Sequence, residues 1–137
     1  MKARERYHRV FERTTYTVWL DDGAHRIRVD APNVFLKGLP GSKRGWALIT
    51  AHNPLPKVLS AEENQRRNEA LAALLDHKGY HYFPALGQAN DWREESFLIA
   101  GITLGDALHI ARSFGQVAIL WGRGDSPAQI VYTDEEE

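Results

Sequence analysis

The N-terminal part of the chain alternates apolar and polar residues in short segments. Thr15 to Leu20 and His25 to Val29 show this period of two and are rich in β-branched and aromatic residues. Asp22-Gly23 lies between them and can take the positive φ of a tight turn, so these residues predict a β-hairpin. Apolar residues at helical spacing predict a short helix over residues 3–12. Prolines, glycines and basic residues predict a loop over residues 31–44.

The segment from Trp46 to Ala51 is apolar on both faces, as expected for a central strand that is covered on two sides. The run Asn53-Pro54-Leu55-Pro56 ends this strand, because proline cannot donate to a β-ladder and restricts the residue before it. Ser60-Ala-Glu-Glu63 then has the form of a capping box. We therefore expect a helix from there to about Lys78, closed by Gly79, with its leucines packed inward.

The rest of the chain repeats this alternation of strands and a helix. Strands are expected at Tyr80 to Leu86 and at Glu95 to Ala100, with the polar stretch from Gly87 to Trp92 between them. Thr103-Leu-Gly-Asp106 predicts the cap of a second helix, which ends at Gly115. A terminal hairpin is then expected to pair Val117–Trp121 with Ala128–Tyr132.

From Trp46 to Trp121 the predicted order is strand, helix, strand, strand, helix, strand. This is the order of the split βαβ, or ferredoxin-like, arrangement, which places the helices mainly on one face of a mostly antiparallel sheet. The first hairpin and the last strand would extend that sheet. The expected class is therefore α+β, in a single domain of 137 residues. Its core spans residues 14–132, between a basic helix or arm (1–13) and an acidic tail (133–137).

Composition narrows the class of protein further. Hydrophobic residues make up 43% of the chain and charged residues 26%, which is typical of soluble globular proteins. The longest apolar run is far shorter than the roughly 18 residues of a membrane span, and the start Lys2-Ala-Arg-Glu-Arg6 is rich in charge where a signal segment would be apolar. The absence of cysteine excludes disulfides and thiolate metal sites. We therefore expect a cytoplasmic protein without a membrane segment.

Charge is unevenly distributed along the chain, although its formal net value is only -1. Residues 1–13 are rich in lysine and arginine, whereas the chain ends in Asp134-Glu-Glu-Glu137. Both ends are typical of a solvated arm and a frayed tail. The positive charge of the remainder is too weak to predict nucleic-acid binding by itself, so a nucleic acid is not the expected partner.

Uncharged polar residues occupy positions where a small domain normally places hydrocarbon. Asn64 and Asn68 share one helical stripe with Leu71 and Leu75, so their amides point toward the sheet. Asn53 follows the end of the central strand. A helix N-terminus near that strand end would add free amide protons and a positive dipole end, which favours an anionic or carbonyl-rich ligand. The alternative is structural: Asn53 caps a turn, while Asn64 and Asn68 satisfy the irregular backbone from Pro54 to Leu59.

A second group of polar residues lies at the start of the predicted strand Glu95 to Ala100. Trp92, Glu94 and Ser96 share one face at a period of two. An indole, a carboxylate and a hydroxyl in line can stack on a ring and hydrogen-bond it, and Glu94 can act as a general acid or base if burial raises its pKa. Alternatively, this is an edge-strand face on which Glu94 pairs with an arginine. Gln116 either closes the same pocket or begins a strand.

Four segments together resemble a known family. They are Thr50-Ala-His-Asn-Pro54, Ser60-x3-Asn64-x3-Asn68, Trp92-x-Glu94-x-Ser96 and Phe114-Gly-Gln-Val-Ala118. In order and spacing they are similar to an uncharacterised family of small bacterial proteins, a domain of unknown function. The resemblance covers most of residues 14–132. It implies no assigned activity, cofactor or ligand, and it marks these positions as patterned.

The sequence therefore predicts a polar cleft at the carboxyl end of the Trp46–Ala51 strand, which binds a small polar ligand of nucleotide-like chemistry. Its expected lining is Thr50, Asn53, Asn64, Asn68, Trp92, Glu94, Ser96 and Gln116. The identity of any cofactor does not follow from the sequence. A metal site is not expected, because Gly79 ends the helix between His77 and His81, which would otherwise have suitable helical spacing.

Two functions of other classes stay open. A protein-interaction or regulatory module would use sheet edges and form a homodimer. A weak nucleic-acid binder would use the basic residues Arg4, Arg6, Arg9, Arg13, Arg26, Arg28, Lys37, Lys43 and Arg44. Whether the chain is an enzyme is open as well, since the sequence contains no known catalytic motif and Glu94 is its favoured acid or base candidate.

Overall fold

The computed structural model describes residues 9–52, 58–89 and 92–134, without the side chain of Trp92. Within these residues one sheet contains β1 (Thr15–Leu20), β2 (Gly23–Ile27), β3 (Trp46–Ile49), β4 (His81–Ala89), β5 (Trp92–Ala100), β6 (Ala118–Gly122) and β7 (Gln129–Tyr132). The helices are α2 (Ala61–Lys78), α3 (Leu104–Ser113) and a short 3-10 helix, η1 (Val34–Leu36). Residues 9–13 are helical, and the rest of the predicted N-terminal helix lies outside the described residues.

The strands lie in the order β2-β1-β4-β5-β3-β6-β7, and every neighbouring pair is antiparallel. Helix α2 connects β3 to β4, and α3 connects β5 to β6, so each helix links two strands that have another strand between them. The α+β class is confirmed, with a sheet that is antiparallel throughout its described strands rather than mostly so. The hairpin β1–β2 and the last strand β7 extend the sheet at its two ends, as predicted.

Local sequence determines where the two long helices begin and end. The Ser60 side chain accepts a hydrogen bond from the Glu63 N–H at 3.1 Å, as the capping-box pattern predicts. At the other end of α2, Gly79 adopts the left-handed conformation (φ 77°), in which a larger residue would be strained. Thr103 caps α3 through the Asp106 N–H at 3.2 Å. Both predicted helix starts are therefore confirmed.

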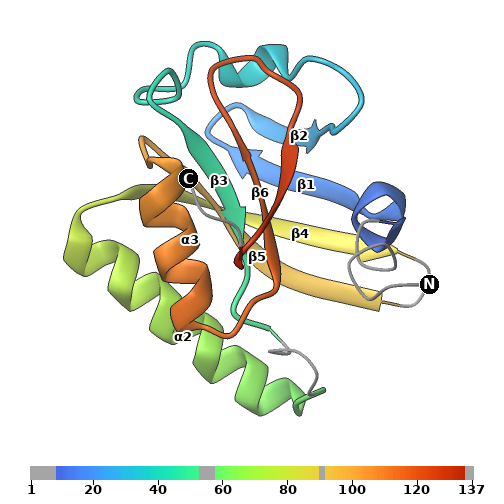
Figure 1. The fold of residues 1–137 in the computed structure, drawn as a ribbon, viewed down its shortest axis with the longest axis vertical. Helices are drawn as coiled ribbons and strands as arrows, with labels where there is room; N and C mark the ends of the chain where they lie inside the picture. The colour runs from blue at the N-terminus through green and yellow to red at the C-terminus, as the bar shows by residue number, and fades with distance from the viewer. Residues whose placement is uncertain (1–8, 53–57, 90–91, 135–137) are drawn as a thin grey trace.

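Helices α2 and α3 lie on one side of the sheet (Figure 1), and an apolar layer fills the space between them and the strands. Leu71 and Leu75 of α2 and Leu108 of α3 pack there against strand residues such as Ile49 and Ile99. All five side chains are almost completely buried, and removing each of them from water stabilises the fold by roughly 1.5–3 kcal/mol. Successive strand residues point to opposite faces of the sheet, so the strand residues in this layer identify the positions that face the helices.

The opposite face of the sheet carries a second apolar layer. Trp46 and Leu98 point to this side, where they join Val18 of β1 and Leu36 of η1. The predicted loop over residues 31–44 thus contains a 3-10 helix whose leucine covers the sheet. A sheet that is covered on both sides explains why β3 is buried at every position, as its sequence predicts.

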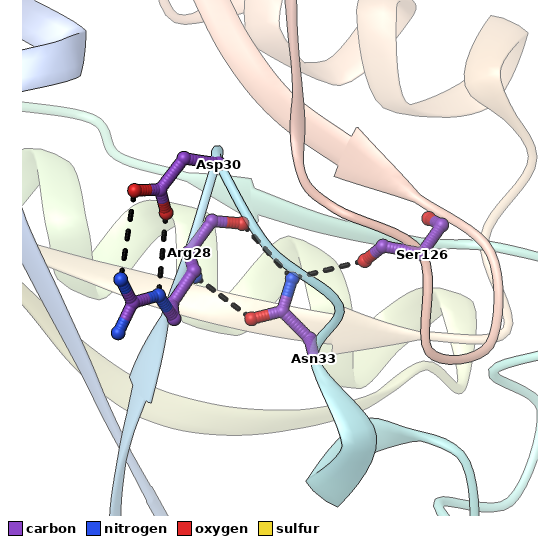
Figure 2. A network of polar contacts seen from close by, with 4 residues as sticks. All are labelled: Arg28, Asp30, Asn33 and Ser126. Carbon is purple, nitrogen blue, oxygen red and sulfur yellow. Dashed lines mark hydrogen bonds and ion pairs between the residues drawn. The ribbon is translucent and has the colours of Figure 1, made fainter.

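A buried asparagine joins the two outer strands at one corner of this second layer. Asn33 is 1% exposed, and its side chain accepts a hydrogen bond from the Arg28 N–H at 2.7 Å. Its amide nitrogen donates to the carbonyls of Arg28 (3.0 Å) and Ser126 (2.9 Å), as Figure 2 shows. The Ala128 N–H also donates to the Arg28 carbonyl at 2.9 Å. The chain leaving β2 is thereby held against the chain that enters β7.

Two strands of the sheet end earlier than the hydrophobic pattern predicts. β2 ends at Ile27 instead of Val29, and it begins at Gly23 because this glycine already pairs with Leu20 of β1. β3 ends at Ile49 although Ala51 is also fully buried. In both cases the hydrophobic pattern predicts which residues are buried. The end of a strand depends instead on where its main chain stops pairing with a neighbouring strand.

The hairpin formed by β4 and β5 is longer than predicted. The polar stretch from Gly87 to Trp92 was expected to separate the strands, and this was wrong, because β4 continues to Ala89 and β5 begins at Trp92. The register pairs Gly87 with Glu94 and Ala89 with Trp92. Main-chain hydrogen bonds extend the ladder here irrespective of the polarity of the side chains. The extension carries Glu94 into the sheet.

Replacing Asn33 tests the corner at which the outer strands meet. Asn33→Ala removes three hydrogen bonds and leaves the Arg28 N–H and the Ser126 carbonyl without this partner, while the Arg28 carbonyl keeps its bond from Ala128. Because each buried unpaired group costs about 1–3 kcal/mol, we expect the free energy of unfolding in urea to fall by about 2–4 kcal/mol. Asp30→Ala is the control in the same loop, since it removes only an exposed ion pair with Arg28 and should change stability little. Equal effects of the two substitutions would contradict the structural role of Asn33.

Candidate functional site

Strand β5 separates the predicted site residues into two groups. Glu94 and Ser96 lie on the same face of β5 as Leu98, which points away from α2. Asn64 and Asn68 lie on the buried stripe of α2, on the other side of the sheet. The single cleft that was predicted to combine these residues therefore does not form, because a strand directs successive side chains to opposite faces. Each group has surroundings of its own.

A groove of about 750 Å³ lies between the first half of α2 and strands β4 and β5. This helix-side groove is lined by His52, Ala61, Asn64, Gln65, Asn68, Glu69, Ala72, Leu86, Arg93, Glu95 and Phe97. Apolar carbon from the helix and the two strands forms part of its wall, and amide, imidazole and charged groups form the rest. Its volume lies within the roughly 300–1,000 Å³ that is usual for small-ligand pockets.

Ala51 lies just beyond the end of β3 and is held by two side chains of α2. Its N–H donates to Asn68 Oδ1 at 3.4 Å, and its carbonyl accepts from Arg67 Nε at 2.6 Å. Arg67 also donates to the Phe114 carbonyl and lies over the Phe114 ring, with its Cζ 5.8 Å from the ring centroid. The sequence gives no sign of this role, since Arg67 lies beside the apolar stripe of α2, where an arginine is usually solvated.

His52 is held in the same way, by its own segment and by the turn that follows α3. Its N–H donates to Thr50 Oγ1 at 3.1 Å, and its carbonyl accepts from Gln116 Nε2 at 2.9 Å. Thr50 Oγ1 in turn donates to the Glu95 carbonyl at 2.7 Å. Gln116 lies outside β6, which begins at Ala118, and it is not among the described residues that line the groove. Gln116 instead supports His52, which does line the groove.

The amides of Asn64 and Asn68 bind main chain that lies outside the regular elements. Asn68 accepts from Ala51, and Asn64 Nδ2 donates to the Leu59 carbonyl at 3.5 Å. The bond to Leu59 is of the kind that the structural alternative predicts for Asn64, whereas Asn68 binds Ala51, which precedes the stretch from Pro54 to Leu59. Both side chains also line the helix-side groove. They therefore combine support of the backbone with a place in the groove wall.

His52 is a groove residue to which the sequence alone assigned no role. Its side chain is half-buried, and its Nε2 is out of contact with solvent and has no hydrogen-bond partner among the described residues. A buried polar atom without a partner costs roughly 1–3 kcal/mol. Burial lowers the pKa of His52, and the charge of Glu95 opposes this in part, so the ring is uncharged at neutral pH. The available clue in the sequence is its position directly after a strand that is apolar on both faces.

Glu94 belongs to a polar group on the other face of the sheet. Burial raises the pKa of Glu94 to about 7, and a hydrogen bond with the Thr50 side chain lowers it in part. Ser96 is buried, and its Oγ has no hydrogen-bond partner within the described residues. Thr50, Glu94 and Ser96 are thus predicted site residues that share one side of the sheet. Among the described residues no arginine pairs with Glu94, so the predicted ion-pair alternative is not seen there.

Tyr16 lies beside Glu94 because the residue between them is a glycine. The register pairs Tyr16 with Gly87 and Gly87 with Glu94 across three neighbouring strands. A Cβ at Gly87 would lie 3.4 Å from Cε1 of the Tyr16 ring. Burial raises the pKa of Tyr16, a hydrogen bond with Thr14 lowers it in part, and the charge of Glu94 raises it further. Tyr16 therefore joins the Glu94 group, a contact that was not predicted from the sequence.

Two residues of the predicted lining cannot be placed with either group. Asn53 lies outside the described residues, and the structure describes the main chain of Trp92 but not its side chain. Their roles stay predictions. Among the described residues, no three histidine, aspartate or glutamate side chains gather in a way that can hold a metal ion. None of the helices described there has the length and apolar character needed to cross a membrane.

Comparison with known proteins identifies a segment that carries the groove lining and most of the Glu94 group. A family model described as protein of unknown function (DUF3293) matches residues 49–119. No curated protein and no solved structure matches the chain. The matched segment contains every residue that lines the helix-side groove, and it also contains Thr50, Glu94, Ser96 and Gln116. Tyr16 lies outside it.

The raised pKa of Glu94 predicts a stability that depends on pH. In the folded chain Glu94 keeps its proton up to about pH 7, whereas an ordinary carboxyl ionises near 4.5. As the pH rises through this range, the unfolded chain releases the proton first, so the burial of Glu94 lowers the free energy of unfolding. Glu94→Gln removes this effect. The variant should be more stable than the wild type by up to about 3 kcal/mol near pH 8, and by little near pH 4.5.

Urea denaturation across this pH range measures the difference between variant and wild type. The matched control is Glu62→Gln, which removes an exposed carboxylate in the first turn of α2, outside the Glu94 group. Its difference from the wild type should stay small and should not grow with pH. A Glu94→Gln difference that is constant across the range would show that Glu94 is not buried in the folded chain.

Proposed function

We propose that this chain, which belongs to the DUF3293 family of proteins of unknown function, binds a small polar ligand of nucleotide-like chemistry in the helix-side groove. The observation that carries this proposal is a hollow of about 750 Å³ whose wall combines apolar surface with groups able to recognise a polar ligand. The proposed binding site therefore lies between α2 and the β4–β5 hairpin, and not in the cleft that was predicted from the sequence.

The apolar part of the groove suits a planar ring. Leu86 and Phe97 supply apolar surface on the sheet side, and Ala61 and Ala72 supply it on α2. The Phe97 ring packs edge-on against Tyr82, with the two centroids 5.2 Å apart, which fixes its position. Because each alanine carries only a methyl group, these two positions of the helix take up little of the groove. A flat heterocycle would bury its faces between the two sides.

The polar part of the groove carries charges of both signs. Arg93 can bind an anionic group such as a phosphate, and Glu69 and Glu95 can accept hydrogen bonds from amino groups. Neither Arg93 nor Glu95 forms an ion pair with another described residue, so their charges are available to a ligand. A nucleotide combines a phosphate, a planar base and amino groups on the base. These features support nucleotide-like chemistry over a purely anionic or purely apolar ligand.

Glu94 has no part in this binding proposal. It lies on the face of β5 that points away from the groove. A general acid or base must lie within hydrogen-bond reach of the group that it serves, and Glu94 is separated from the groove by the sheet itself. We therefore propose ligand binding without an assigned reaction.

We also propose that the elements from β3 to β6 form a ferredoxin-like core. The support comes from the order of the four central strands, β4-β5-β3-β6, and from the shared apolar layer beneath α2 and α3. Each of these helices links two strands that have one other strand between them, as in a split βαβ unit. In this view β1, β2 and β7 are additions at the two ends of the core sheet.

Self-association through a sheet edge is a second candidate function. β2 and β7 are outermost in the sheet order, so each has one edge without a partner strand among the described residues. Such an edge can accept a strand from a second copy of the chain by β-augmentation. We expect sedimentation velocity to show a dimer whose fraction rises with protein concentration. A monomer at every concentration would remove this candidate and leave the ligand groove unaffected.

Nucleotide binding can be measured with the purified chain. We expect at least one of the adenosine, guanosine, cytidine and uridine monophosphates to raise the melting temperature. Arg93→Ala should weaken the binding of that nucleotide about tenfold, or about 1.4 kcal/mol by titration calorimetry, because it removes the guanidinium of the groove. Arg66→Ala removes an exposed arginine of α2 outside the groove and should leave the affinity unchanged. If none of the four nucleotides stabilises the protein, the proposal fails.

A further inference from the structure

One short segment in the wall of the helix-side groove has all of its main-chain polar groups bound by side chains. Residues 51 and 52 make four such hydrogen bonds, with Thr50, Arg67, Asn68 and Gln116. We propose that His52 is the specificity-determining residue of the groove, which recognises the uncharged edge of a nucleobase, and that Arg67, Asn68 and Gln116 are its positioning residues. This inference rests on the proposed ligand groove.

The positioning bonds come from three separate parts of the fold. Arg67 and Asn68 belong to α2, Thr50 to the chain that leaves β3, and Gln116 to the turn between α3 and β6. They bind the N–H and the carbonyl of both residues 51 and 52, at donor–acceptor distances between 2.6 and 3.4 Å. With its main chain held, the imidazole retains only rotation about its side-chain bonds. Its place in the wall is therefore set before a ligand arrives, which lowers the entropic cost of binding.

Support of the main chain does not by itself account for a histidine at this position. The four bonds involve only backbone atoms of residues 51 and 52, so another side chain at position 52 would leave them intact. The imidazole adds a cost, because its Nε2 is out of solvent and has no partner in the described part of the chain. An apolar side chain would fill the same half-buried place without that cost. The unpartnered nitrogen therefore points to a partner that the bound ligand supplies, and because Nε2 has no surface exposed to solvent, the imidazole must rotate about its side-chain bonds to present it to the groove.

The surroundings of His52 decide what its imidazole can recognise. Burial lowers its pKa, and Glu95 opposes this in part. The other charged residues of the groove lining are Glu69 from α2 and Arg93 from β5, while Arg67 from α2 faces the preceding carbonyl. A neutral imidazole has one donor and one acceptor nitrogen, which match the N–H groups and ring nitrogens on the edge of a nucleobase. The guanidinium of Arg93 is then the partner of the phosphate.

Recognition by a neutral imidazole makes binding depend on pH in one direction. A base bound against the half-buried imidazole covers more of the ring, and burial disfavours the charged imidazolium. Binding of the base and protonation of His52 therefore compete. The affinity falls as the pH drops through the pKa of His52, and the bound ligand in turn lowers that pKa further. A histidine that bound the phosphate as a cation would show the opposite dependence, with affinity rising on acidification.

The test uses titration calorimetry of the full chain with adenosine, guanosine, cytidine and uridine, which lack the phosphate. For the nucleoside that binds most tightly, we expect the affinity of the wild type to fall on acidification from pH 7.5 to 5.5. His52→Phe keeps an aromatic ring and should lower the affinity at pH 7.5 about tenfold, with loss of the pH dependence. His77→Phe replaces an exposed histidine in the last turn of α2 and should have neither effect.

Gln116→Leu tests the positioning role separately, because it removes the bond to the His52 carbonyl without touching the imidazole. We expect a smaller loss of affinity than with His52→Phe. The midpoint of the pH profile should also move upward, since a ring that is held less firmly is more exposed to water. Reduced stability with an unchanged midpoint would show that Gln116 supports only the backbone, and would overturn its positioning role.

The outcomes separate this inference from the ligand proposal on which it rests. If nucleosides or nucleotides bind the wild type, and His52→Phe binds them equally tightly with the same pH dependence, the role of His52 is overturned and the groove stands. If none binds the wild type, both fail. Should His52→Phe not fold, an NMR titration of the wild-type His52 ring decides the question. Its midpoint should fall when the nucleoside is added, and an unchanged midpoint would overturn the inference.

Discussion

A main-chain N–H or carbonyl that leaves a buried sheet must find a new partner, because water cannot reach it there. Side chains supply these partners at two places in this protein. Asn33 does so where the outer strands approach each other, and residues of α2 and of the turn after α3 do so beyond β3. The first set of bonds joins the chain that leaves β2 to the chain that enters β7. The second set gives the helix-side groove a fixed wall.

This requirement couples the stability of the fold to the candidate site. Asn68 lines the groove and also binds the main chain of Ala51, so its loss would disturb backbone and groove together. Arg93 and the His52 ring lack such a role in the described structure, and they can report on a ligand without unpairing the backbone. Within the groove lining, the residues that support the backbone are therefore different from those whose side chains remain available to a ligand.

The sheet itself divides the polar chemistry of the molecule. On the helix side, charged and amide groups line an open groove. On the other side, Glu94 lies among Tyr16, Thr50 and Ser96, where burial raises its pKa to about 7. A carboxyl in this state destabilises the fold once it ionises. Two groups of residues that lie close together in the sequence thus face different environments and have different electrostatic properties.

The sequence by itself determined the helix caps, the first hairpin, the two-sided burial of β3, the α+β class and membership of the family, because each depends on residues close together in the chain or on their spacing. Only the tertiary structure decided which side of the sheet each polar residue faces. The register of β5 turned Glu94 away from Asn68, and the packing of α2 brought Arg67 to Ala51. Such contacts depend on how distant strands pair and helices cross, and local spacing does not encode that information.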